Sequence, residues 1–202
     1  MNRVQVAFVA FASLLVTACS GPAFKGDVTR FNNLPPANGG SVNVMPADEA
    51  LIGSLEFGTY ADMLGRHLES QGYQPAGGEP ADLIAVVEYE IGDGREKLIN
   101  RPRVSMGFGY RSRNYSYWGW HDPFAFHDNN EVYARTYYPA TLKVTLRNAE
   151  TDEVLFEGRV ESESRKNALP EIMPYMLQAM FEGFPGANGE TRQIVISPPD
   201  SE

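Results

Sequence analysis

The stretch Ala140-Thr141-Leu142-Lys143-Val144-Thr145-Leu146 is the clearest indication of the fold, because apolar and polar side chains alternate along it without interruption. Successive side chains of a strand point to opposite faces, so this pattern predicts a strand with one buried and one solvated face. Glu150-Thr151-Asp152-Glu153 supplies a polar turn, and residues 154–161 return as an alternating partner. The two segments predict an antiparallel hairpin.

Two amphipathic helices are predicted on either side of this hairpin in the sequence. Residues 55–71 repeat apolar side chains at three- and four-residue steps, and Gly72 ends that helix. Residues 169–182 carry the strongest helical pattern in the chain, and we interpret their methionines as a packing surface rather than a cofactor site. The stripe of the first helix comprises Leu55, Tyr60, Ala61, Leu64 and Leu68.

Further strands complete the predicted fold. They are expected at residues 27–31, 41–45, 83–91, 103–110 and 193–196. One-sided helices and alternating strands combine most simply as an α+β fold, with a single antiparallel β-sheet and two amphipathic helices packed on one face. We expect this one domain to span residues 27–197, followed by a loose tail at residues 198–202.

The amino terminus has the pattern of a bacterial lipoprotein signal. Arg3 precedes an apolar run over residues 4–16, which is too short to cross a bilayer as a helix, since that needs about 20 residues. The run ends in Leu15-Val16-Thr17-Ala18-Cys19-Ser20, which resembles the bacterial lipobox. We expect residues 1–18 to be a cleaved signal peptide, Cys19 to carry the lipid and residues 19–26 to form a tether. Ordinary secretion, with Cys19 incidental, is the alternative.

The residue after the cysteine bears on location. In lipoproteins that this sequence resembles, an aspartate at that position favours retention at the inner membrane. Ser20 stands there instead. The resemblance therefore implies a lipid-anchored protein of the outer membrane that faces the periplasm or, less often, the outside.

Charge and cysteine content exclude several classes of protein. Lys and Arg number 17 against 26 Asp and Glu, which gives a net charge of −9. Removing residues 1–18 takes away one arginine and no acid, so the net charge becomes −10. Such a chain is a poor partner for nucleic acid. Cys19 is the only cysteine, which leaves the domain without a disulfide or a thiolate zinc site, and no cofactor is predicted.

A long loop at about residues 111–131 is rich in aromatic side chains and contains both tryptophans. The wider window 95–138 carries seven Lys and Arg against four Asp and Glu, a local net charge of +3. We predict a contact surface for a glycan, lipopolysaccharide or an envelope protein; the alternative is a hairpin connection whose aromatics cover the sheet. The predicted contact residues are Arg111, Arg113, Tyr115, Tyr117, Trp118, Trp120, Phe124 and Phe126.

Other chemistry-bearing residues have plainer interpretations. His121 and His127, each followed by an aspartate, are weak candidates for metal ligands, because their spacing matches no known ligand pattern and chance pairs on a polar turn explain them better. Glu88 and Glu90 could mimic a hydrolase dyad, but a solvated strand face explains them better. His67 is expected on the solvent edge of the first helix.

Several short motifs carry a family resemblance. After the lipobox these are Leu68-Glu69-Ser70-Gln71-Gly72-Tyr73, Pro80-Ala81-Asp82-Leu83-Ile84, residues 140–146, Val154-Leu155-Phe156-Glu157-Gly158 and Phe184-Pro185. On these motifs the sequence resembles the bacterial lipoprotein family catalogued as domain-of-unknown-function 4136, over most of residues 27–185. It departs from the family at Phe156, where tryptophan is common, and by the long aromatic insertion. The resemblance implies an envelope lipoprotein with an α+β fold and no established catalytic residues.

These observations favour an outer-membrane-anchored lipoprotein with a non-enzymatic binding or structural role in the cell envelope. Its partners would be the membrane, through lipid on Cys19, and an envelope protein, glycan or lipopolysaccharide. The alternative is an envelope-polymer hydrolase or a metal-binding protein. No nucleophile elbow or other acid–base constellation supports the hydrolase.

Overall fold

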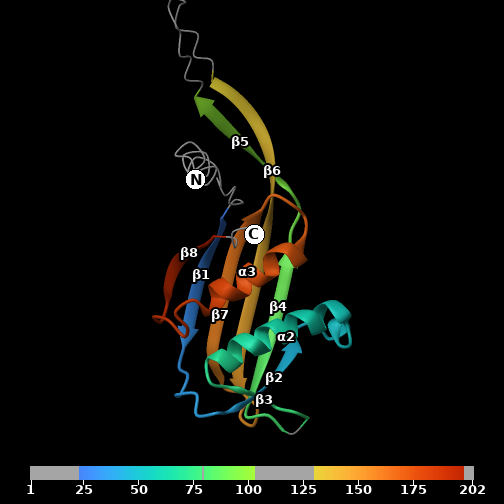
Figure 1. The fold of residues 1–202 in the computed structure, drawn as a ribbon, viewed down its shortest axis with the longest axis vertical. Helices are drawn as coiled ribbons and strands as arrows, with labels where there is room; N and C mark the ends of the chain where they lie inside the picture. Colours follow the sequence, from blue (N-terminus) through green and yellow to red (C-terminus); the bar gives the residue numbers. More distant parts are fainter. Residues whose placement is uncertain (1–22, 79, 103–129, 198–202) are drawn as a thin grey trace, which may run out of the picture.

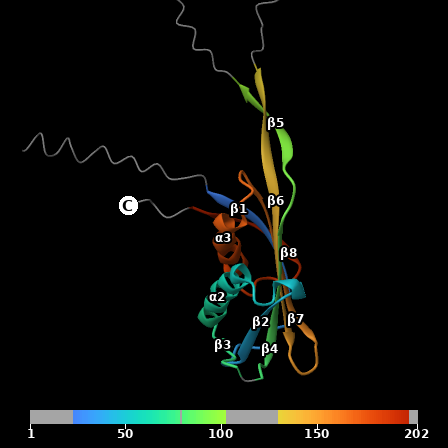
Figure 2. The ribbon, with the colours of Figure 1, turned by 90° about the vertical axis from the view of Figure 1, so that its right-hand side faces the viewer.

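The computed structural model describes residues 23–78, 80–102 and 130–197, and Figure 1 shows their path. One sheet carries two helices on the same face, as the edge-on view in Figure 2 shows. The elements in chain order are β1 Phe24–Asn32, β2 Ser41–Pro46, the 3-10 helix η1 Glu49–Leu51, α2 Leu55–Ser70, β3 Gln74–Pro75, β4 Leu83–Ile91, β5 Arg95–Pro102, β6 Asn130–Asn148, β7 Val154–Ser164, α3 Leu169–Phe181 and β8 Glu190–Ile196.

The sheet is mixed, so the prediction of a purely antiparallel sheet is wrong. Its strand order is β3-β2-β4-β6-β7-β1-β8, and β2 pairs in parallel with both β4 and β3. The reason is connectivity: α2 carries the chain from the end of β2 back to the start of β4, and such a crossover leaves neighbouring strands parallel. The predicted α+β class is confirmed, and both helices pack on one face of the sheet.

A polar latch fixes the start of the parallel pair. The Ser41 amide and hydroxyl both donate to the Asp82 carboxylate at 2.8 Å, and the Asp82 amide donates back to the Ser41 hydroxyl at 3.0 Å. These hydrogen bonds hold the pKa of Asp82 below its ordinary value. The latch aligns Val42 with Leu83, where the parallel register begins.

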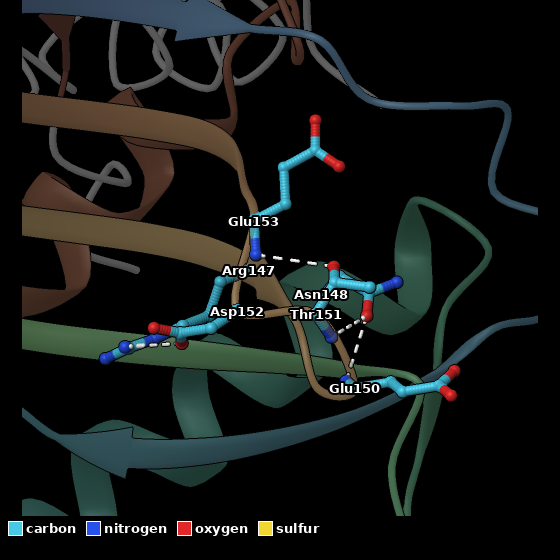
Figure 3. Close-up of polar contacts among 6 residues, drawn as sticks. All are labelled: Arg147, Asn148, Glu150, Thr151, Asp152 and Glu153. Atoms are coloured by element: carbon cyan, nitrogen blue, oxygen red, sulfur yellow. Dashed lines mark hydrogen bonds and ion pairs between the residues drawn. The ribbon is translucent and has the colours of Figure 1, made fainter.

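The predicted hairpin is confirmed as β6 and β7, with Leu142 opposite Val160. Figure 3 shows its turn, where the Asn148 side-chain oxygen accepts hydrogen bonds from the amides of Glu150 and Thr151, both at 2.9 Å. Asp152 has a φ of 58° and pairs with Arg147 at 2.8 Å. Aspartate tolerates this left-handed conformation better than most residues, which suits it to the turn.

The core lies between the helices and the sheet. Phe57, Tyr60, Leu64 and Leu68 of α2 are buried, whereas Leu55, predicted in this stripe, is 91% exposed. Leu55 is the first residue of α2, directly after the Ser54 cap, and so stands at the very end of the helix. The largest fully buried side chains are Phe156, Leu64, Leu142, Leu146, Met173, Met176, Leu177, Met180, Val28, Val144 and Val160.

Several element bounds differ from the predictions. β1 begins at Phe24, inside the segment expected to be a tether, and β6 begins at Asn130 rather than near Ala140. β5 was not predicted, and the strand expected at residues 103–110 lies outside the described residues. Within the described ranges, none of the helices has the length and apolarity needed to cross a membrane.

Candidate functional site

A two-stranded arm projects from the body of the sheet (Figures 1 and 2). It consists of β5 and residues 130–137 of β6, which pair antiparallel from Arg95 opposite Tyr137 to Pro102 opposite Asn130. Further along β6, β4 takes over the same pairing, with Ile91 opposite Ala140. The arm is thus a continuation of the β4–β6 pair beyond the part of the sheet that the helices cover.

A one-residue shift separates the arm from the body. Ile91 pairs with Ala140, and Arg95 pairs with Tyr137. Three residues, 92–94, therefore lie between these pairs on one strand, but only two residues, 138 and 139, lie between them on β6. Because side chains alternate with a period of two, this extra residue turns Arg95 to the opposite face from Ile91. A Cβ on Gly94 would lie 2.6 Å from the Thr136 methyl carbon, so the shift depends on a residue without a side chain.

One face of the arm combines cations with aromatic rings. Residues paired across a sheet share a face, which puts Arg95 with Tyr137, Lys97 with Arg135 and Ile99 with Tyr133. The Lys97 ammonium lies 5.6 Å from the centre of the Tyr137 ring, and the Arg135 guanidinium lies 5.5 Å from the Tyr133 ring. Contacts of this length hold each cation over a ring face. We call these six residues the cationic face.

The cationic face continues onto the solvated side of the sheet. Lys97 forms an ion pair with Glu163 of β7 at 2.6 Å, and both side chains are about half exposed, at 52% and 51%. Glu163 alternates with the residues of β7 that face the helices, so the cationic face points away from the helices. The other face of the arm carries Leu98 and Val132, which are 75% and 56% exposed.

The sheet face below the arm is a solvated ladder of opposite charges. Glu88 and Glu90 are exposed there, and Glu88 lies opposite Lys143 on the neighbouring strand. Lys143 in turn approaches Glu157 at 3.8 Å, and Arg159 pairs with Glu161. Exposed ion pairs of this kind, across strands or along one strand, stabilise a sheet modestly, and their exposed position matches the interpretation of the two glutamates as a solvated strand face.

A groove of about 580 Å³ runs between α2 and the β2–β3 edge. Val42, Leu68 and Tyr73 form its apolar floor, and Asp62 and Arg66 stand among its charged lining. Across the described ranges, no three His, Cys, Asp or Glu side chains are grouped to hold a metal ion. The groove therefore offers shape and mixed polarity without a set of reactive groups.

Arg30 is a buried functional group that the sequence patterns did not indicate. It is 5% exposed, and one of its terminal nitrogens donates to the carbonyls of Ala179 and Glu182 at 2.8 and 2.9 Å. These carbonyls end α3 and have no partner within the helix. Burial lowers the pKa of Arg30, with a smaller effect of Arg192 in the same direction and an opposing one of Glu182. Its role is to fasten α3 to β1.

His67, expected on the solvent edge of α2, is partly buried and packs against the second helix. Its ring stacks on Phe181 of α3 with 5.1 Å between ring centres, and burial lowers its pKa, assisted by the neighbouring Arg66. The apolar side of α2 is broad enough to bring position 67 against the second helix, which the first helix pattern alone does not reveal. His67 therefore belongs to the α2–α3 interface.

Tyr60, which is buried, and Tyr89, which is partly buried, form a polar cluster with their rings edge to face at 5.1 Å. The Tyr60 hydroxyl donates to Glu56 at 3.0 Å, and burial, followed by this hydrogen bond, raises the pKa of Tyr60. Burial also raises the pKa of Tyr89, whose hydroxyl has no hydrogen-bond partner within the described chain. Both phenols stay neutral at physiological pH, which fits packing rather than proton transfer.

The predicted contact residues themselves lie outside the described residues. This holds for Cys19, for the metal candidates His121 and His127, and for the whole aromatic set. The aromatic set comprises Arg111, Arg113, Tyr115, Tyr117, Trp118, Trp120, Phe124 and Phe126. The structure shows that the two described ends of the window 95–138 form the arm. Three cations of this basic window, Arg95, Lys97 and Arg135, lie on its cationic face.

Fold and surface together define a single-sheet α+β domain with a projecting cationic arm. The chain belongs to the family described as a domain of unknown function (DUF4136), whose model matches residues 27–186. An uncharacterised protein of Zymomonas mobilis subsp. mobilis is 24% identical over 233 residues, which cover 91% of this chain and 84% of that protein.

Solved structures offer weaker likenesses. A PDZ domain protein from Parabacteroides distasonis aligns with a TM-score of 0.49 and 12% identity, covering 98% of this chain but only 44% of that one. A PelC dodecamer from Paraburkholderia phytofirmans aligns with a TM-score of 0.38 and 11% identity, over 76% of this chain and 94% of that one.

Proposed function

We propose that this chain is an outer-membrane lipoprotein, anchored by lipid on Cys19, with a non-enzymatic binding role in the cell envelope. The observation that carries the proposal is the cationic face, since it is presented on an arm that leaves the packed body. An isolated two-stranded ribbon is marginally stable in water, so its projection from a well-packed sheet suggests a contact made there. The periplasmic side of the membrane is the proposed location.

The anchor is supported by the sequence that precedes the domain. The only cysteine follows a short apolar run and a small residue, and β1 begins five positions after it. Attachment by several acyl chains would hold the domain lastingly, whereas one chain binds only marginally. The domain would then work close to the membrane surface, which limits its partners to components of the envelope.

The arm chemistry favours a ligand with anionic groups. Guanidinium groups bind phosphate and carboxylate in a bidentate manner, and tyrosine rings add apolar area with a polar hydroxyl. Phosphorylated or acidic glycans, lipopolysaccharide, phospholipid headgroups and acidic proteins all offer such groups. Turnover of peptidoglycan fragments by the purified chain would contradict the non-enzymatic role and favour the hydrolase alternative.

The anchor is tested by Cys19→Ala in a cell that expresses the full chain. We expect labelled palmitate to be incorporated by the wild-type protein and not by Cys19→Ala, which should leave the membrane fraction while keeping the fold. Ser20→Ala is the matched control, because it alters the neighbouring residue without removing the thiol. A Cys19→Ala protein that still fractionates with the outer membrane would show that the anchor is wrong.

A further inference from the structure

The chain enters the domain at the same end of the sheet from which the arm projects. Gly26 of β1 lies opposite Ser162 of β7, and Ser162 lies opposite Ala140 of β6. Phe24, two residues closer to the amino terminus, lies level with Tyr138, the residue next to the arm. Figure 1 shows this arrangement, with the start of β1 near the base of the arm. A lipid on Cys19 would therefore hold the arm end of the domain toward the membrane.

Lengths then decide how the arm can lie. The eight residues of β5 extend about 26 Å beyond the body at the usual rise of a strand. The five peptide steps from Cys19 to Phe24 span at most about 18 Å when fully extended. The arm is longer than the tether, so it cannot stand upright between the domain and the membrane. It must tilt, which turns one of its faces toward the surface.

Charge selects the cationic face for this contact. The whole chain carries a net charge of −9, so an anionic surface repels the body. The cationic face offers Arg95, Lys97 and Arg135, and the Lys97–Glu163 ion pair is exposed enough to contribute little against a new partner. Tyrosine is also favoured at the headgroup level of membranes. The opposite face has Leu98 and Val132 but carries Glu96 and, among its described residues, no cation.

We propose that the arm lies on the phospholipid surface of the membrane that holds the anchor, with its cationic face on anionic headgroups. This inference rests on the proposed function, because it takes the anchor at Cys19 as the origin of the geometry. The arm would act as a second attachment point, which fixes the orientation of the domain where the lipid alone leaves it free to rotate.

The test uses the chain from residue 20 onward, which lacks the anchor and contains every described residue. It is sedimented with vesicles of phosphatidylcholine containing about one quarter phosphatidylglycerol, and with vesicles of phosphatidylcholine alone. We expect binding only to the anionic vesicles, and weaker binding at high salt. Arg95→Gln with Lys97→Gln and Arg135→Gln should lower the partition coefficient at least about tenfold, since each cation near such a surface is worth roughly fivefold.

Two matched variants separate the face from net charge and from apolar insertion. Arg66→Gln with Arg147→Gln and Arg192→Gln removes the same charge from the helix side and the far end of the body and should change binding less than about twofold. Leu98→Ser with Val132→Ser alters the opposite face and should leave binding intact. Circular dichroism of each variant checks that the fold is retained.

Several results would overturn the inference. They are equal loss in the arm and body triple variants, greater loss in the Leu98 and Val132 variant, or equal binding to neutral vesicles. Retention on purified peptidoglycan that only the arm variant loses, without vesicle binding, would assign the face to a glycan instead. Since lipidation of Cys19 is measured separately, a lipidated protein with an indifferent arm would defeat this inference and leave the proposed function in place.

Discussion

At the scale of single residues, Arg30 shows how one side chain joins two elements. Its side chain leaves β1 on the helix side and meets the carbonyls that end α3, where a cation also interacts favourably with the helix dipole. Gly186 approaches so closely that a Cβ there would lie 2.9 Å from the guanidinium. The contact thus organises both the end of α3 and the loop that leads to β8.

We predict that Arg30→Met lowers the free energy of unfolding by about 2–4 kcal/mol, because one buried and one partly buried carbonyl lose their donor. Urea titration followed by circular dichroism measures the loss. Arg30→Lys should fall in between, since an ammonium keeps the charge but cannot reproduce the geometry of the guanidinium. Arg159→Met, on the solvated sheet face, is the control. A change at Arg30 no larger than this control would contradict the role in fastening α3.

We expect His67 to make the α2–α3 interface sensitive to pH. Its pKa is lowered in the folded state, so the unfolded chain binds the proton more readily. Stability is therefore fully present above the ordinary histidine pKa of about 6.5 and falls as the pH drops through the lowered folded value. We expect the midpoint of urea unfolding to decrease from pH 7.5 to pH 5.5 by less in His67→Phe than in the wild type. An equal decrease would show that His67 does not titrate against the fold.

Residue positions within a helix were only partly predictable. The stripe of α2 was correctly expected at Tyr60, Leu64 and Leu68, but Leu55 is exposed and Phe57 is buried in its place. A helix pattern gives the direction of the apolar face, whereas the end of that face depends on where the partner sheet stops. Arg30 could have been suspected from its alternation with Val28, whose side chain shares the buried face of β1.

At the scale of elements, regular alternation was a dependable predictor and exposed ribbons were not. β4 has the predicted bounds, and the β6–β7 hairpin is where residues 140–161 placed it. β5 was not predicted, because both faces of the arm are in contact with solvent and the strand therefore has no alternation of apolar and polar residues. The parallel pairing of β2 was not predicted either, because packing across the sheet determines which strands are neighbours and the pattern within one strand does not reveal it.

The glycine step between body and arm is open to a direct test. Gly94→Ala brings a Cβ against Thr136 and the Tyr138 ring, at 2.6 and 2.9 Å, so we expect β5 to separate from β6. Hydrogen exchange of the β5 amides should quicken by about tenfold or more, while the melting temperature of the body changes little. Gly58→Ala in α2 meets nothing within 4 Å and should stabilise slightly. Unchanged exchange in β5 would contradict the close approach at Gly94.

At the scale of the whole molecule, the basic region of the sequence and the start of the domain lie at the same end of the sheet. The basic window 95–138 of this acidic chain includes both strands of the arm. The arm leaves the sheet at the end where β1 begins. The sequence could indicate that the region was basic and aromatic, but not which cations share a face. That depends on the one-residue shift at residues 92–94, which no periodic pattern reveals.

Photocrosslinking from position 137 in cells is the sharpest test of the proposal that the arm lies on the membrane to which a lipid on Cys19 would attach the chain. A benzoylphenylalanine replaces Tyr137 on the cationic face in one variant and Thr151, at the opposite end of the sheet, in another. We expect phospholipid adducts from position 137 and essentially none from position 151. Equal lipid adducts at both positions, or only protein and glycan adducts from position 137, would contradict it.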